Sequence, residues 1–272
     1  MSGHDHPRVR PPAVAGLFYP GDPGELAALV RAELDAAVQA DDPAGHVPPH
    51  ALVAPHAGYV YSGPIAASAY ARVLPRRHEV ERVVLLGPNH RAPLRGMAVP
   101  SVDAMATPLG TVAIDDDARR LLLQRRDVVV DDRPHAAEHS LEVHLPFLQI
   151  VLEPGWTVVP VLVGQTSAEQ VADLLDGLWG GPETLVVVST DLSHYHDHDT
   201  AQGLDAATAA AVVAGQWDEV VPDRACGAFP LRGLMVEAGR RALEVEVLDL
   251  RNSGDTAGDR SRVVGYGAFA VG

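Results

Sequence analysis

The chain has 272 residues, of which 47% are hydrophobic, and it carries a formal charge of −15 from 36 acidic and 21 basic side chains. This charge opposes binding to nucleic acid and to anionic membrane surfaces, because both reward clustered positive charge. All basic side chains are arginine, so the sequence has no Walker A phosphate loop and no lysine for a Schiff base. We therefore expect no nucleic-acid or membrane partner and no nucleotide or pyridoxal phosphate cofactor.

The N-terminal part of the chain predicts an extended segment that leads into a helix. We expect residues 1–9 to form a flexible tail, and the prolines and glycine of 10–20 favour an extended, turning segment. Asp22 is a candidate N-cap and Pro23 suits the first helical position, ahead of an apolar stripe that reaches residue 38. A helix is therefore predicted to begin after Asp22.

The remaining chain alternates between apolar runs and amphipathic stretches. Strands are predicted at residues 51–55, 82–87, 157–163, 184–190, 244–250 and 262–271. Helices are predicted at residues 64–74, 116–125, 138–150, 167–179, 200–214 and 230–243. Residues 92–114 are interpreted as irregular strands or hairpins, and Ser167 with Gln170 predicts a capping box.

This alternation predicts an α/β sandwich, with a central mixed, largely parallel sheet flanked by helices. Residues 1–272 are interpreted as a single domain, because the sequence shows no low-complexity linker and no internal repeat of fixed period. We find no run of eighteen apolar residues and no signal-peptide pattern, and a lone cysteine cannot form an intramolecular disulfide. We therefore expect a cytoplasmic protein.

Three apolar runs each end in a short polar loop that carries a histidine, namely His56, His90 and His194. Such runs are typical of strands covered on both faces, and ligands of open α/β sheets bind beyond the carboxyl ends of such strands. Neutral imidazole is a common ligand of Zn, Fe, Cu and Ni, and Cys226 would add a softer thiolate donor. These donors predict a shared metal site. The alternative is that the histidines cap loops at the strand ends without binding metal.

The single cysteine, Cys226, has two interpretations. A lone cysteine usually behaves as a small buried hydrophobe. Gly227 permits close backbone approach, and Pro230 is suited to start the following helix. If the N-terminus of that helix faces the thiol, its pKa falls and a thiolate ligand becomes feasible.

Two further segments carry side chains suited to acid–base chemistry. Asp191 and His194 follow an apolar strand, where a carboxylate can orient an imidazole. In residues 138–150, helical geometry would place Glu142 and His139 where both reach one cavity. The alternative for this second segment is a solvated acidic helix face.

Eight blocks of this sequence resemble the Memo family, in order and over nearly the whole chain. They include Ala-Pro-His-Ala-Gly-Tyr at 54–59, Gly-Pro-Asn-His at 87–90 and Ser-Thr-Asp-Leu-Ser-His-Tyr at 189–195. The other blocks lie at residues 12–20, 138–147, 160–164, 226–227 and 261–266. Eight blocks in one order are far more specific than any single motif of this chain.

The resemblance implies a single α/β domain similar to the class III extradiol, non-heme iron dioxygenases. Bacterial and archaeal members are commonly labelled AmmeMemoRadiSam system protein B and are expected to act beside a radical-SAM protein. Eukaryotic members are described as signalling proteins with redox and metal-binding roles. Carried onto this sequence, the resemblance implies three metal ligands, His56, His90 and Cys226. It implies pocket residues at Asp191, His194, His139 and Glu142.

The leading hypothesis is a metal-binding protein that holds iron or copper, with zinc as a further option, for redox or oxygen-linked chemistry on an unknown substrate. His194 would move the proton, oriented by Asp191. The thiolate of Cys226 would replace the carboxylate found in related dioxygenases, and because sulfur is itself oxidisable, this argues against ring cleavage.

Two alternatives remain open. One is a non-catalytic module whose pocket binds a peptide or a small molecule, with Tyr59 as a candidate contact. The other is a zinc hydrolase in which a water is activated near Glu142.

Overall fold

A mixed β-sheet forms the centre of the computed structural model, which describes residues 7–272. Its strands are β2 (Ala51–Ala54), β3 (Arg82–Pro88), β4 (Met97–Val99), β7 (Val128–Val130), β8 (Thr157–Val163), β9 (Thr184–Ser189), β10 (His194–His196), β11 (Val245–Asn252) and β12 (Val263–Val271). The order across the sheet is β10-β12-β2-β9-β3-β8-β4-β7, and β11 pairs with β12. The central strands β2, β9, β3 and β8 run parallel, whereas β12 and β4 flank them in antiparallel orientation. The predicted mixed, largely parallel sheet is confirmed.

A second, small sheet contains β1 (Val9–Arg10), β5 (Ala104–Thr107) and β6 (Gly110–Ala113). Val9 pairs with Ala104 in this sheet. The N-terminal tail was therefore predicted too long: Val9 lies in a strand, and residues 1–6 are outside the described part of the chain. The predicted hairpin region 92–114 contains β5 and β6, which pair in antiparallel orientation.

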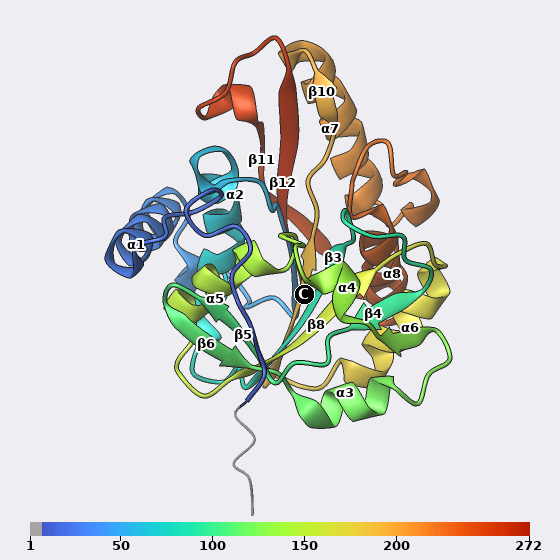
Figure 1. Cartoon of the computed structure of the whole chain (residues 1–272). Coiled ribbons are helices and arrows are strands. Elements are labelled where there is room, and N and C mark those ends of the chain that lie inside the picture. The colour runs from blue at the N-terminus through green and yellow to red at the C-terminus, as the bar shows by residue number, and fades with distance from the viewer. Residues whose placement is uncertain (1–6) are drawn as a thin grey trace, which may run out of the picture.

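Helices cover both faces of the main sheet (Figure 1). The α-helices are α1 (Pro23–Ala40), α2 (Tyr59–Ala71), α3 (Asp116–Leu122), α4 (Asp132–His135), α5 (Leu145–Val151), α6 (Ala168–Leu178), α7 (His198–Val213) and α8 (Ala228–Arg240). Short 3-10 turns are η1 (Pro43–Gly45), η2 (Leu74–Arg76), η3 (Glu142–His144), η4 (Trp217–Glu219) and η5 (Ser253–Asp255). α1, α2 and α5 contribute to one apolar cluster and α6, α7 and α8 to a second. Within residues 7–272, none of these helices combines the length and the apolar composition needed to cross a membrane.

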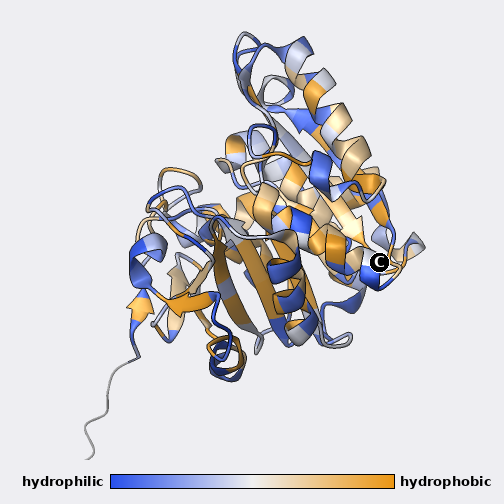
Figure 2. Ribbon diagram, turned by 90° about the vertical axis from the view of Figure 1, so that its right-hand side faces the viewer, coloured by the Kyte–Doolittle hydropathy of each residue, from blue (hydrophilic) through white to orange (hydrophobic). Residues whose placement is uncertain are grey.

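The apolar strands predicted from sequence form the buried interior. β2, β9 and almost all of β3 and β8 are buried, and Figure 2 shows the central strands in the colour of hydrophobic residues. Parallel strands covered on both faces need apolar side chains on both sides, which explains their continuous runs. The predicted N-cap at Asp22 and the capping box of Ser167 and Gln170 are both confirmed.

The helix predicted to start at Pro64 begins earlier, at Tyr59. Tertiary contacts hold this first turn: the Tyr59 N–H donates to the carbonyl of Phe18 at 2.7 Å, and its hydroxyl donates to the carbonyl of Val143 at 2.5 Å. Proline prefers the first helical turn, and this preference was the basis of the wrong boundary. Packing against two distant segments overrides it.

The helix predicted over 138–150 is also interrupted, because residues 138–141 are not helical. The carboxylate of Glu138 accepts the backbone N–H groups of His139 at 2.9 Å and Ser140 at 3.0 Å. These donors are therefore satisfied by a side chain rather than by a helix. The regular α-helix α5 begins only at Leu145.

Candidate metal centre

Side chains from three neighbouring parallel strands meet at one edge of the main sheet. His56 follows β2 by two residues, His90 follows β3 by two and Asp191 follows β9 by two. Because β9 lies between β2 and β3 in the sheet, their carboxyl ends are adjacent. The expectation that the strand ends carrying His56 and His90 meet at one site is confirmed, whereas His194, the third histidine expected there, lies in β10.

His56 is held as a neutral imidazole whose Nε2 carries no proton. Its Nδ1 lies 2.6 Å from the hydroxyl oxygen of Ser189. That hydroxyl donates its only proton to the carbonyl of Ser140 at 2.6 Å, so it accepts from His56 Nδ1 and leaves Nε2 unprotonated. Burial lowers the pKa of His56 well below its usual range, and the nearby His90 and His139 add to this.

His90 is oriented by a buried carboxylate. Its Nδ1 donates to Glu138 Oε1 at 3.0 Å, and its backbone N–H donates to Glu138 Oε2 at 2.6 Å. Burial alone would raise the pKa of Glu138, but hydrogen bonds from His90 and Ser140 lower it to about 2. A carboxylate that fixes one imidazole nitrogen while the other is free is the arrangement that supports metal-bound histidines.

The third member of this cluster is His139. His56, His90 and His139 each offer one ring nitrogen, and these three atoms lie within 4.8 Å of one another. Among residues 7–272, Nδ1 of His139 is buried without a hydrogen-bond partner. Burial lowers the pKa of His139 as well. Converging imidazole nitrogens fit a transition-metal ion, so the structure contains a candidate metal-binding histidine cluster.

Cys226 lies beside this cluster but is not one of its three members. Its Sγ is 3.3 Å from His56 Nε2 and accepts the backbone N–H of Asp191 at 3.2 Å. Burial raises the pKa of the Cys226 thiol, so the expected lowering by the following helix α8 does not occur. His139, predicted as a pocket residue, belongs to this candidate cluster, and ligation by Cys226 stays a prediction.

The carboxylate of Asp191 forms a hydrogen bond with the backbone of His56 rather than with His194. Asp191 Oδ1 accepts the backbone N–H of His56 at 2.8 Å, and burial raises the pKa of Asp191. His194 is oriented instead by the carbonyl of Leu192, to which Nδ1 donates at 2.7 Å. The predicted Asp191–His194 hydrogen bond is therefore absent from residues 7–272, and Nε2 of His194 remains available for proton transfer.

A cleft of about 460 Å³ leads to this region, and we call it the histidine cleft. Its lining includes His139, Asp191 and His194, together with Leu17, Phe18, Val60, Tyr61, Tyr195, Asp259, Arg262 and Tyr266. Tyr59 does not line it, contrary to expectation, because its ring is buried and its hydroxyl is bound to Val143. The next two residues of α2 line the cleft in its place.

Glu142, a predicted catalytic residue, is instead part of a buried ion pair. Its Oε2 accepts Arg10 Nη1 and the Ala13 N–H, both at 2.7 Å. Its Oε1 accepts the Tyr19 hydroxyl at 2.6 Å and the Val14 N–H at 3.0 Å. The expectation that Glu142 and His139 share one cavity is therefore wrong, because the non-helical segment 138–141 changes their relative directions.

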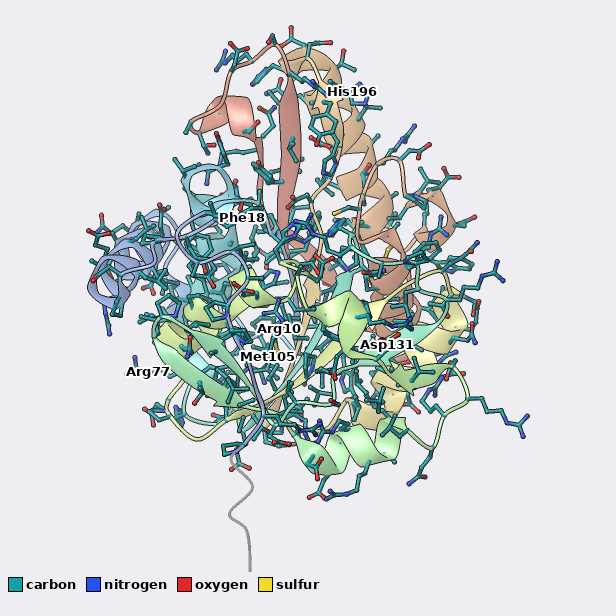
Figure 3. The ribbon with its side chains drawn as sticks, in the orientation of Figure 1. Arg10, Phe18, Arg77, Met105, Asp131 and His196 are labelled. Carbon is teal, nitrogen blue, oxygen red and sulfur yellow. The ribbon has the colours of Figure 1, made fainter. Side chains whose placement is uncertain are left out.

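The Arg10–Glu142 pair connects the N-terminal segment to the metal-site loop. Arg10 also donates to the carbonyls of His135 at 2.7 Å and Glu138 at 2.5 Å. Further along the same segment, the ring of Phe18 packs on that of His139, with their centroids 4.8 Å apart. Figure 3 labels Arg10 and Phe18, which lie along this segment near the middle of the view. No local pattern in the sequence indicates this connection.

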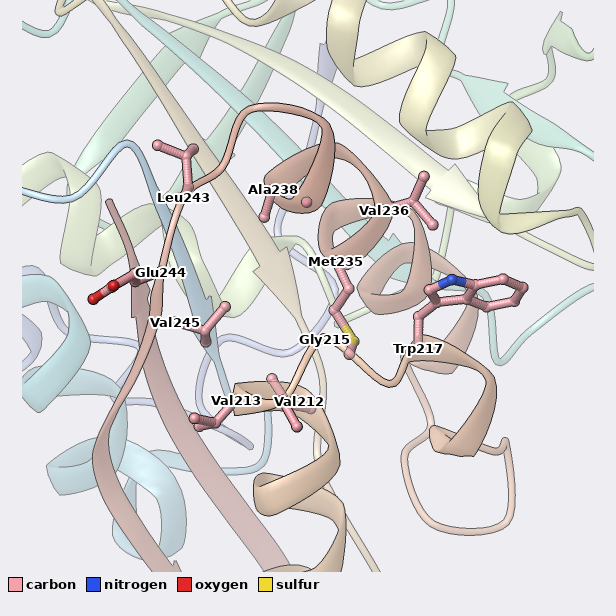
Figure 4. Close-up of a pocket in the computed structure, with 12 residues that line it drawn as sticks. Val212, Val213, Gly215, Trp217, Met235, Val236, Ala238, Leu243, Glu244 and Val245 are labelled. Carbon is pink, nitrogen blue, oxygen red and sulfur yellow. The ribbon is translucent and has the colours of Figure 1, made fainter.

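A second cavity, of about 620 Å³, lies between α7, α8 and β11 and contains no histidine (Figure 4). Trp217, Met235 and Val245 are among its lining residues. It therefore does not belong to the candidate metal centre.

Similarity to known proteins supports the resemblance seen in the sequence. The model of the family described as Memo-like protein matches residues 10–270. A MEMO1 family protein of Methanopyrus kandleri is 39% identical over 281 residues, which cover 96% of this chain and 98% of that protein. A MEMO1 family protein of Aquifex aeolicus is 36% identical, over 95% of this chain and 97% of that protein. A MEMO1 family protein of Aeropyrum pernix is 35% identical, over 97% of this chain and 100% of that protein. This chain therefore belongs to the Memo family.

Proposed function

We propose that this protein binds a redox-active transition metal, iron or copper, through His56, His90 and His139, and that it carries out oxygen-linked or redox chemistry on a small substrate. The single observation that supports this most is the convergence of three ring nitrogens within 4.8 Å at the carboxyl edge of a parallel sheet. Zinc also fits imidazole donors. The likeness to class III extradiol dioxygenases remains part of the proposal.

Each residue of the site has a role that follows from its contacts. His56 offers Nε2 because Ser189 accepts from its Nδ1, and His90 is oriented by Glu138. A bound iron or copper ion would supply Lewis acidity and one-electron chemistry. His194, with Nε2 free in the histidine cleft, accepts or donates the proton of the substrate. Hydrolysis with Glu142 as base has no support, because both of its oxygens are occupied.

The test is metal content of the tag-free protein purified without oxygen. We expect about one metal ion per chain in the wild type, and a large loss in His90→Ala and His139→Ala. His194→Ala is the matched control: it should keep the metal and lose any turnover. Negligible metal in the wild type, or equal metal in wild type and His139→Ala, would refute the three-histidine centre.

Loading the same proteins with Co(II) tests whether Cys226 is a metal ligand. With three histidine ligands, the spectrum lacks a thiolate-to-metal charge-transfer band, and Cys226→Ser leaves it unchanged. A band that disappears in Cys226→Ser would show instead that the thiolate is a ligand, as the family resemblance implied. This outcome would replace His139 by Cys226 in the proposed ligand set.

The place of action and the partner are separate parts of the proposal. A free, half-buried Cys226 thiol beside His56 suits the reducing cytoplasm, where thiols persist. A radical-SAM protein is the proposed partner, and co-purification of the two expressed together tests it. If they separate at micromolar concentration with and without metal, the partner is ruled out.

A further inference from the structure

Exposed hydrophobic side chains surround the histidine cleft. Leu17 is 81% exposed, Tyr195 64% and Val60 63%, and Tyr61 is also exposed. All four line this cleft, although they come from the N-terminal segment, the start of α2 and β10. Single exposed hydrophobic residues are common, whereas a group around one concave site indicates contact with an apolar ligand.

The backbone directs Tyr195 toward this cleft at a conformational cost. The pairing of β10 with β12 shifts register between His194 and His196, and Tyr195, the residue between them, has a φ of +67°. A bulge of this kind turns a side chain in a new direction, and positive φ in a bulky residue is uncommon outside functional sites. The ring of Tyr195 lies under the guanidinium of Arg262, with 4.4 Å between Cζ and the ring centroid.

Arg262 therefore presents an unpaired cation to the cleft. Within residues 7–272 it forms no ion pair with a carboxylate, since Asp255, in the preceding loop, pairs with His198 and Arg260 instead. Asp259, on the same cleft, accepts the N–H of Ser261 at 2.6 Å instead. A guanidinium stacked by its face on an aromatic ring keeps the N–H donors at its edge free, and these match the two oxygens of a carboxylate.

We propose that the histidine cleft binds a small-molecule carboxylate with an apolar body, the acid group on Arg262 and the body on Leu17, Val60 and Tyr195. The volume of about 460 Å³ is that of a small-molecule site rather than a protein interface. Only the chemical conversion of the bound ligand, which would lie next to His194 and His139, rests on the proposed function. Binding itself requires no metal.

The test compares phenylbutyrate with phenylbutanol, which have the same apolar body and differ in the acid group. Calorimetric titrations use the full chain, once metal-loaded and once treated with a chelator. We expect phenylbutyrate to bind about tenfold more tightly than phenylbutanol, because only the acid forms a charge-assisted hydrogen bond with Arg262. Arg262→Gln should remove this preference and leave phenylbutanol binding unchanged. Arg260→Gln, whose arginine does not line the cleft, is the control that keeps the preference.

Leu17→Ser tests the apolar contact, and it should weaken both probes by a similar factor. Equal binding of acid and alcohol to the wild type, or an unchanged preference in Arg262→Gln, would overturn the proposal. A preference that needs the metal and ignores Arg262 would also overturn it, because the carboxylate would then be a metal ligand. If the wild-type chain cannot be loaded with metal and still prefers the acid through Arg262, the proposed function fails and this inference stands.

Discussion

Replacing Glu142 by leucine should destabilise the whole domain, because its carboxylate joins the N-terminal segment to the metal-site loop. The substitution removes the partner of Arg10, whose side chain is 5% exposed in an ion pair of 2.7 Å with a fully buried carboxylate. It also leaves the Ala13 and Val14 N–H groups and the Tyr19 hydroxyl without their acceptor. A buried guanidinium that loses its only carboxylate cannot be rehydrated in place.

The expected size follows from the burial of the pair. Removing one partner of a buried ion pair costs about 3–5 kcal/mol. For a domain of about 150–250 residues, 1 kcal/mol shifts the melting temperature by roughly 2–4 °C. Glu142→Leu should therefore lower the melting temperature by roughly 6–20 °C. Glu142→Gln, which keeps an acceptor oxygen, should cost less than Glu142→Leu.

Urea unfolding followed by circular dichroism measures this free energy, with Glu153→Leu as the control. Glu153 is 59% exposed and lies 4.0 Å from Arg77, so its replacement should change stability by less than about 0.5 kcal/mol. Adding Arg10→Met to Glu142→Leu should recover part of the loss, since no buried charge then remains unpaired. A loss below 1 kcal/mol in Glu142→Leu, combined with lost activity, would refute the structural role and restore Glu142 as a catalytic residue.

Two further substitutions test the loop beside the metal site and the pH dependence of stability. A Cβ at Gly87 would lie 2.7 Å from Leu141 Cδ2 and 2.9 Å from Ser140 Oγ. Gly87→Ala should therefore lower the free energy of unfolding in urea by about 1–3 kcal/mol and reduce the metal content. If neither the stability nor the metal content changes, the close packing at Gly87 is contradicted. Burial lowers the pKa of His144, whose Nδ1 contacts the Tyr70 hydroxyl at 2.8 Å, to about 3. Below pH 6.5 the unfolded chain therefore binds a proton at His144 that the native state does not bind. The free energy of unfolding is fully retained above pH 6.5 and falls by about 1.4 kcal/mol per pH unit as the pH decreases from 6.5 toward 3. His144→Leu should flatten the pH profile of unfolding in that window, and parallel profiles would contradict this pKa.

The convergence of strand ends could be predicted from sequence because it depends on local patterns. Continuous apolar runs indicate parallel strands covered on both faces, and parallel strands end at the same edge. This reasoning brought His56 and His90 together without any knowledge of strand order. It did not foresee that the chain after β9 continues into β10, where His194 lines the histidine cleft instead of joining the cluster.

The direction of the 138–150 segment could not be predicted, since it depends on a side chain competing with the backbone. Glu138 accepts N–H groups that a helix would use, and no periodicity in the sequence records this choice. The helical assumption then misdirected the interpretation of Glu142, whose partner Arg10 is 132 residues away. Pairs separated by this distance along the chain are determined by the tertiary fold alone.

Burial acts in opposite directions on the two kinds of donor that could supply a third metal ligand. An imidazole ligates in its neutral form, so burial, which lowers the pKa of His139, prepares it for a metal. A thiol ligates after losing its proton, so burial, which raises the pKa of Cys226, opposes ligation until a cation compensates. From the sequence, Cys226 was expected as the third ligand and His139 only as a pocket residue, because the environment of each side chain depends on the fold. Three imidazoles thus converge at this edge of the sheet, and the protonated Cys226 thiol lies beside that of His56.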